Sequence, residues 1–115
     1  MRRLDIDGSR FNDFAGFVEE FSRLLPDHAW NGNLDAFNDI LSDGDAIVWN
    51  HSDASREHLG HMAMIAHLES VLQTCHPSNR RVVRRELRAA QRGEGPTLFD
   101  LLVGIIEPHS RLELR

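Results

Sequence analysis

Apolar and polar residues alternate near both ends of the 115-residue chain, as they do in a strand with one buried face. Close to the start, Leu4 and Ile6 alternate with acidic residues before Gly8 offers a turn. Close to the end, the same alternation predicts a strand over residues 111–115. A third, buried strand is expected at residues 46–49, where a short apolar run is flanked by turn-forming residues.

Between these strands, apolar residues recur with a helical period in five segments, and we expect helices over residues 13–25, 34–42, 55–74, 80–92 and 97–107. Asn12, Asn33 and Asn79 are the expected N-caps of the first, second and fourth helices, and Thr97 with Asp100 has the pattern of a capping box. Strands separated by helices predict a parallel sheet that the helices cover, so the expected fold class is α/β.

The length and composition are those of one globular domain, which we expect to span residues 1–115: 41% of the residues are hydrophobic and 27% are charged. No apolar run approaches the roughly 20 residues of a membrane helix, and the start lacks a secretory apolar segment, so we expect a cytoplasmic protein. Cys75 is the single cysteine and cannot form an internal disulfide or a zinc cluster. Because no GxSxG, HExxH or EF-hand pattern is present, we expect neither an enzyme nor a metal or cofactor site.

The net charge of the chain is −5, and its acidic residues are concentrated in the first half. Between Arg23 and Arg56 there is no basic residue. The same stretch contains six aspartates: Asp27, Asp35, Asp39, Asp43, Asp45 and Asp53. A concentration of this kind predicts a negative surface that meets cations.

Three of these acids, Asp35, Asp39 and Asp43, recur every four residues, so a helix would direct them from one rigid face. Asp39 is expected in the middle of the helix, where its repulsion of Asp35 opposes helix formation; helix stability therefore does not explain it. Asp43 and Asp45 are interpreted as turn residues and Asp53 as a helix cap.

The sequence around these acids, NGNLDAFNDIL at residues 31–41, resembles the second helix of the barstar family of intracellular ribonuclease inhibitors. The matching positions are Asn33, Leu34, Asp35, Ala36, Asp39 and Leu41. The run Ile6-Asp7-Gly8 is similar to the family's first turn, and Pro26 to the end of its first helix. The resemblance implies a small layered fold with three parallel strands packed against helices. Residues 50–96, between the second and third strands, would then be an enlarged helical region compared with the best-known members.

In this family, acids of the second helix and its preceding loop stand in for RNA phosphates and plug the active site of a small secreted ribonuclease. The resemblance therefore implies that the partner is a basic microbial ribonuclease. The residues expected to bind it are His28, Trp30, Asn33, Asp35, Asn38, Asp39 and Asp43. Asp39 would be the deepest anchor, whereas Trp30 has two open roles, as a rim contact or as a cover of the local core. Asn38 replaces an aromatic of the best-known members, residues 28–30 replace paired tyrosines, and Gly104 replaces a rim acid.

The helix expected over residues 80–92 carries a second charged surface. Its arginines are Arg80, Arg81, Arg84, Arg85, Arg88 and Arg92. They keep open an alternative function, that of a nucleic-acid-associated adaptor, and also weak self-association with the acidic half of another copy. A further alternative is an immunity protein against another toxin nuclease. The negative net charge and the lack of aromatic residues among the arginines favour the ribonuclease inhibitor, with the arginines as a solvated face.

Overall fold

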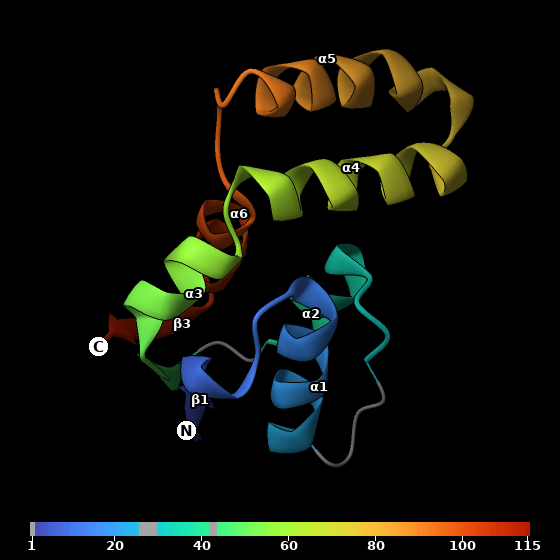
Figure 1. The fold of residues 1–115 in the computed structure, drawn as a ribbon. Coiled ribbons are helices and arrows are strands. Elements are labelled where there is room, and N and C mark those ends of the chain that lie inside the picture. Colours follow the sequence, from blue (N-terminus) through green and yellow to red (C-terminus); the bar gives the residue numbers. More distant parts are fainter. Residues whose placement is uncertain (1, 26–29, 42–43) are drawn as a thin grey trace.

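A three-stranded parallel sheet forms the centre of the protein (Figure 1). The computed structural model describes residues 2–25, 30–41 and 44–115. The strands are β1 (Arg3–Asp7), β2 (Asp45–Asn50) and β3 (Ser110–Leu114). The strand β2 lies in the middle and pairs in parallel with both of the others, so the predicted α/β class with three parallel strands is confirmed.

In the described part of the chain, six α-helices and two short 3-10 helices accompany this sheet. They are η1 (Gly8–Arg10), α1 (Phe14–Leu24), α2 (Leu34–Ile40), α3 (Ser52–His58), α4 (His61–Thr74), η2 (Pro77–Asn79), α5 (Arg80–Gln91) and α6 (Leu98–Ile106). Figure 1 shows α4 and α5 side by side as an antiparallel pair that stands away from the sheet. Within the described ranges, no helix has both the length and the apolar character needed to cross a membrane.

The core between α1, α2 and the sheet is rich in aromatic rings. Phe17, Phe21, Phe37 and Trp49 have no exposed surface. The ring of Phe17 stacks on that of Trp49 with centroids 5.3 Å apart, and Phe21 meets Phe37 edge to face at 4.9 Å. The indole nitrogen of Trp49 donates a hydrogen bond to Ser55 Oγ at 3.0 Å. Large rings bury much apolar area per side chain, so this cluster fixes both helices against the sheet.

A buried carboxylate ties α1 to β1. Glu20 in α1 accepts a hydrogen bond from the backbone nitrogen of Asp7 at 2.9 Å and two from the Arg23 guanidinium, both at 3.1 Å. Arg10 forms an ion pair with the same carboxylate at 3.4 Å. Burial of Glu20 is possible because both of its oxygens have partners.

The predicted helix caps are correct in part. The capping box of Thr97 and Asp100 at the start of α6 is confirmed, with both reciprocal hydrogen bonds at 3.1 Å. The N-cap of α1 is Asp13 and not Asn12, because Asp13 has the extended backbone and its Oδ1 accepts a hydrogen bond from the first turn at 2.8 Å. Asn79 makes no side-chain cap, since the preceding 3-10 turn leads it into α5 with a helical backbone.

The single helix predicted over residues 55–74 is wrong, because the chain turns at Leu59 and Gly60 between α3 and α4. The carbonyl oxygen of Leu59 accepts a hydrogen bond from the Phe99 nitrogen at 2.8 Å, and that of Gly60 accepts one from the Leu98 nitrogen at 3.5 Å. The break is therefore made by contact with the start of α6, which the helical period of the segment does not reveal.

Two aspartates of the acidic stretch have structural roles that differ from the predicted ones. Asp45 is not a turn residue: it is buried in β2 and forms an ion pair with the Arg2 side chain at 2.7 Å. Asp53 is not a cap, because the N-cap of α3 is His51 and Asp53 lies in the first turn. A carboxylate in the first turn is favourable for the helix dipole.

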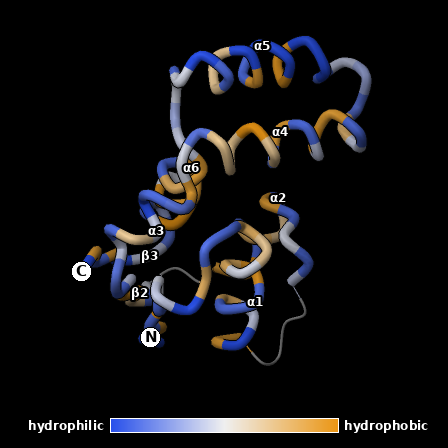
Figure 2. Tube along the Cα trace, in the orientation of Figure 1, coloured by the Kyte–Doolittle hydropathy of each residue, from blue (hydrophilic) through white to orange (hydrophobic). Residues whose placement is uncertain are grey.

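The pair α4 and α5, residues 61–91, is called the hairpin below. Its helices pack through buried side chains that include Leu68 and Val83. At its base, His61 Nε2 lies 3.0 Å from the Gly95 carbonyl oxygen. Figure 2 shows that α5 is largely hydrophilic whereas α6 is largely hydrophobic, as expected for an outer and an inner helix.

Candidate protein-binding surface

The helix α2 is held at its N-terminus by Asn33. The Asn33 Oδ1 atom accepts hydrogen bonds from the backbone nitrogens of Asp35 at 2.8 Å and Ala36 at 3.2 Å, so its predicted role as N-cap is confirmed. Asn31 supports this turn in the same way, because its Oδ1 accepts a hydrogen bond from the Asn33 nitrogen at 3.1 Å. The caps satisfy amides that the helix leaves free and give α2 a defined direction.

Asp35 and Asp39 are both exposed on α2. Residues four apart on a helix have Cβ atoms about 5–6 Å from each other, so the two carboxylates share one face. Within the described part of the chain, neither carboxylate has a hydrogen bond or an ion pair. The helix ends at Ile40, so Asp39 lies in its last turn and not in its middle as predicted. A negative charge there opposes the helix dipole in addition to repelling Asp35.

Asn38 is also exposed on α2, and its side chain contacts a residue far along the sequence. The Asn38 Oδ1 atom is hydrogen-bonded with Nε2 of His109, which is half-buried between α6 and β3. The two residues are 71 positions apart, so the sequence carries no local signal that joins them. His109 thus connects the surface of α2 to the segment between α6 and β3.

Trp30 is buried, with an exposed fraction of 7%. Of the two roles predicted for it, rim contact or cover of the local core, the burial agrees with the second. Its ring stacks on Phe37 with centroids 4.6 Å apart, and its Nε1 donates a hydrogen bond to the Asn33 carbonyl oxygen at 2.8 Å. Trp30 therefore anchors the start of α2 from beneath. The predicted contact residues His28 and Asp43, like Asp27, lie outside the described residues.

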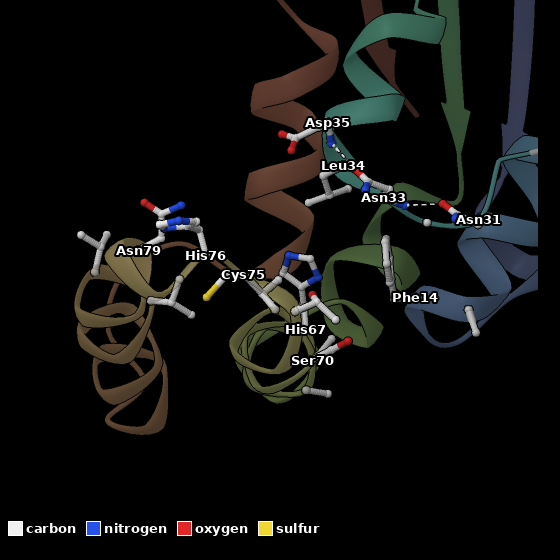
Figure 3. A pocket seen from close by; sticks show the side chains of 18 of the residues that line it. Phe14, Asn31, Asn33, Leu34, Asp35, His67, Ser70, Cys75, His76 and Asn79 are labelled. Atoms are coloured by element: carbon white, nitrogen blue, oxygen red, sulfur yellow. Dashed lines mark hydrogen bonds between the residues drawn. The ribbon is translucent and has the colours of Figure 1, made fainter.

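An open groove of about 1160 Å³ runs beside the N-terminal end of α2. One wall consists of the start of α1, residues 31–33 and the first residues of α2, Leu34 and Asp35; the opposite wall is the hairpin. Figure 3 shows Asp35 on the first wall and His67 and Ser70 on the second. The hairpin thus stands next to the acidic helix, although the two segments are well separated in the sequence.

His67 is one residue through which the hairpin contacts α1. Its ring meets Phe14 edge to face with centroids 5.7 Å apart. Burial lowers the pKa of His67 below its ordinary value of 6.5, because the charged form loses solvation. His67 is therefore neutral at neutral pH and adds no positive charge to the groove.

The arginines of α5 are all exposed. Arg92 forms an ion pair with Glu94 at 3.4 Å. In the described ranges, Arg81, Arg84 and Arg85 have no ion pair. No group of three His, Cys, Asp or Glu side chains in those ranges is arranged to hold a metal ion.

Comparison with protein families connects this surface to a known class of proteins. The sequence matches the family described as Barstar (barnase inhibitor) over residues 1–100. The chain belongs to the barstar family. The match to barstar extends from β1 into α6 and includes α2 with its preceding loop, so the resemblance seen in a few motifs is confirmed over most of the chain. Comparisons with curated proteins and with solved structures give no match.

Barstar proteins inhibit barnase-type ribonucleases, and membership therefore agrees with three broader predictions. The protein is of an inhibitor family and not of an enzyme family, its general function is ribonuclease inhibition, and its partner in general is a protein. The comparison does not concern individual contact residues, which remain predictions.

Proposed function

We propose that this barstar-family protein acts in the cytoplasm and inhibits a basic microbial ribonuclease by placing α2 against the active site. The observation that carries the proposal is the state of Asp39. Its carboxylate is exposed without a partner in the described structure, in the turn of α2 where a negative charge is least favourable for the helix. A residue that opposes local stability fits a role in binding.

The chemistry of such a complex follows from what a ribonuclease must present to RNA. Lysine, arginine and histidine side chains around a phosphate pocket can donate charge-assisted hydrogen bonds to the carboxylates of Asp35 and Asp39. Hydrogen bonds to charged groups are worth about 1.5–3 kcal/mol each. Electrostatic steering would also speed association. The usual example of such steering is the complex of barnase with barstar, a member of this same family, and the association rates of that complex are not predictions for this chain.

The surroundings of the two acids support this role. Asn33 caps α2, and Trp30 holds the carbonyl oxygen of Asn33 from the core side, so the helix is fixed before a partner arrives. A rigid surface loses less conformational entropy on binding. Asn38, held by His109, adds an exposed amide beside the acids.

The test is a titration of the purified protein against barnase and against the ribonuclease activity that the source organism secretes, with RNA cleavage as the measurement. We expect the wild-type protein to abolish cleavage at one equivalent of the ribonuclease that it recognises. The D35N/D39N variant should leave cleavage intact, because it removes both charges with little change of shape. The matched control D5N/D53N removes two exposed carboxylates away from α2 and should inhibit as the wild type does.

Two outcomes would contradict the proposed function. One is undiminished cleavage by every ribonuclease in the titration with the wild-type protein in excess. The other is full inhibition by D35N/D39N, since a surface that works without both carboxylates does not act as a phosphate mimic. Inhibition of a deoxyribonuclease in place of a ribonuclease would favour the immunity-protein alternative.

The unpaired arginines of α5 support a second candidate, binding to nucleic acid. Replacement of Arg81, Arg84 and Arg85 by glutamine would then weaken binding to an RNA oligonucleotide. It would also reduce the salt dependence of binding: the slope of log K against log[salt] should change by about 0.7 for each phosphate that the protein no longer neutralises. The net charge of −5 and the acidic face of α2 make this the weaker candidate.

A further inference from the structure

The groove beside α2 has chemically different walls. Asp13 and Asp35 provide the negative charges of the first wall, and both side chains are exposed. The hairpin wall has no acidic residue in its lining and includes the polar residues Ser70, Thr74 and Asn79. No arginine or lysine lines the groove in the described part of the chain. The groove therefore combines a largely apolar lining with two negative charges, and its charge is complementary to a basic occupant.

The arginines of α5 do not alter this conclusion. Val83 and Ala90 are the buried residues of α5, and Val82 and Val83 are the ones that line the groove together with Asn79. Arg81, Arg84 and the other arginines of the helix are exposed and absent from the groove lining. The positive face of α5 and the negative groove are thus separate surfaces.

The size of the groove indicates the class of its occupant. Its volume of about 1160 Å³ exceeds the roughly 300–1,000 Å³ of common small-molecule sites, and it is open to solvent and not enclosed. A large groove that is open to solvent and carries two acids beside a helix fits a protruding segment of a protein better than a small molecule.

The hairpin is fixed in place at several points. His67 packs on Phe14 of α1, and the base of the hairpin is held by hydrogen bonds from the start of α6 to the carbonyl oxygens of Leu59 and Gly60. A wall fixed in this way can take part in recognition without first having to be ordered.

We propose that this groove receives a basic surface loop of the same ribonuclease whose active site α2 covers, so that the hairpin is a second contact element. The inference rests on the proposed function, because it assumes a ribonuclease docked on α2. Asp35 is exposed on α2 and also lines the groove, so a partner that contacts Asp35 reaches the groove (Figure 3).

The test compares two double variants that each add two arginines to the hairpin. S70R/V82R places them at exposed positions that line the groove; the exposed fraction of Val82 is 51%. Q73R/Q91R places them on the same two helices at exposed positions outside the groove lining. The net charge of both variants is the same, so long-range steering changes equally. We expect S70R/V82R to raise the Kd for the inhibited ribonuclease roughly tenfold or more and Q73R/Q91R to change it by less than about twofold.

A second measurement uses the wild-type chain and does not depend on how the variants fold. The half-buried thiol of Cys75, the single cysteine, lines the groove and can be followed by its reaction with a maleimide. We expect this reaction to be strongly slowed when the ribonuclease is saturating, because the loop covers the thiol.

The outcomes separate the inference from the function on which it rests. Unchanged affinity of S70R/V82R, or a Cys75 thiol that reacts equally fast in the complex, overturns the groove proposal even when D35N/D39N abolishes inhibition. Full inhibition by D35N/D39N overturns the proposed function itself. Equal losses of affinity in S70R/V82R and Q73R/Q91R would mean that charge alone acts, which also overturns the groove proposal.

Discussion

Replacement of Asp39 by alanine should stabilise the free protein while it weakens ribonuclease binding. Asp39 lies in the last turn of α2 and four residues after Asp35, and in the described structure its carboxylate has no partner. A carboxylate at the C-terminal end of a helix costs about 0.3–1 kcal/mol. Repulsion between like charges four residues apart adds about 0.2–0.5 kcal/mol. D39A should therefore raise the free energy of unfolding by about 0.5–1.5 kcal/mol.

The measurement is urea unfolding followed by tryptophan fluorescence, which is suitable because Trp30 and Trp49 are both buried and become exposed on unfolding. For a domain of this size, about 1 kcal/mol corresponds to a shift in Tm of roughly 4 °C. The Kd for the ribonuclease should rise about tenfold to a hundredfold, which is the loss of one hydrogen bond between charged groups.

A matched variant tests the reasoning about helix ends. D100A removes an exposed aspartate from the opposite end of a helix, where Asp100 completes the capping box with Thr97. It should lower the free energy of unfolding by about 1 kcal/mol. Destabilisation of the free protein by D39A would refute the expected effect, because Asp39 would then make a stabilising interaction and its placement would need no explanation from binding.

Three further changes test the parts of the fold that position the surface. N33A should lower the free energy of unfolding by about 1 kcal/mol in urea, because it removes the N-cap of α2. G8A should lower it by about 3 kcal/mol, because a Cβ atom there would lie 2.4 Å from Ser55 Oγ and 2.6 Å from a backbone carbonyl oxygen. Burial lowers the pKa of His67 in the folded state. The stability that neutral His67 contributes is therefore fully present above pH 6.5, the pKa in the unfolded state. As the pH falls from 6.5 toward the pKa of the folded state, the free energy of unfolding should decrease by at most about 1.4 kcal/mol per pH unit.

Each of these changes has a control. N33S should retain most of the stability that N33A loses, and equal losses would show that the cap is unimportant. S55G removes the hydrogen-bond partner of Trp49 Nε1, so the effect of G8A is measured against S55G alone; G8A should cost less in that background if the clash with Ser55 contributes. H67Q should lose less stability than the wild type between pH 7 and pH 5, and parallel pH profiles of the two proteins would contradict the role assigned to His67.

Local patterns in the sequence were sufficient for much of the fold and for the centre of the candidate site. The alternation around Leu4 and the apolar run that ends at Trp49 predict strands, and Asn33 marks the start of α2. The common exposed face of Asp35 and Asp39 also follows from spacing alone. These features depend on residues within about four positions of one another, where backbone geometry determines the direction of each side chain.

The sequence failed where a residue's environment is made by distant parts of the chain. Asp45 looked like a turn residue, yet it pairs in β2 with Arg2, which is 43 positions away. Glu20 gave no signal of its burial, because its partners include a backbone amide of β1 and the side chain of Arg10. The sequence leaves two roles open for Trp30, and its stacking on Phe37 shows that it belongs to the core.

The sequence by itself therefore determined most of the elements, the family and the acidic face of α2, because periodicity and charge spacing are local properties. Only the tertiary structure decided that the chain turns at Gly60 and that the resulting hairpin stands opposite Asp35. It also brought His109 to Asn38 across 71 positions. The physical reason is that these contacts form when the sheet and α6 bring separate segments together, and no spacing along the chain encodes which surfaces will meet.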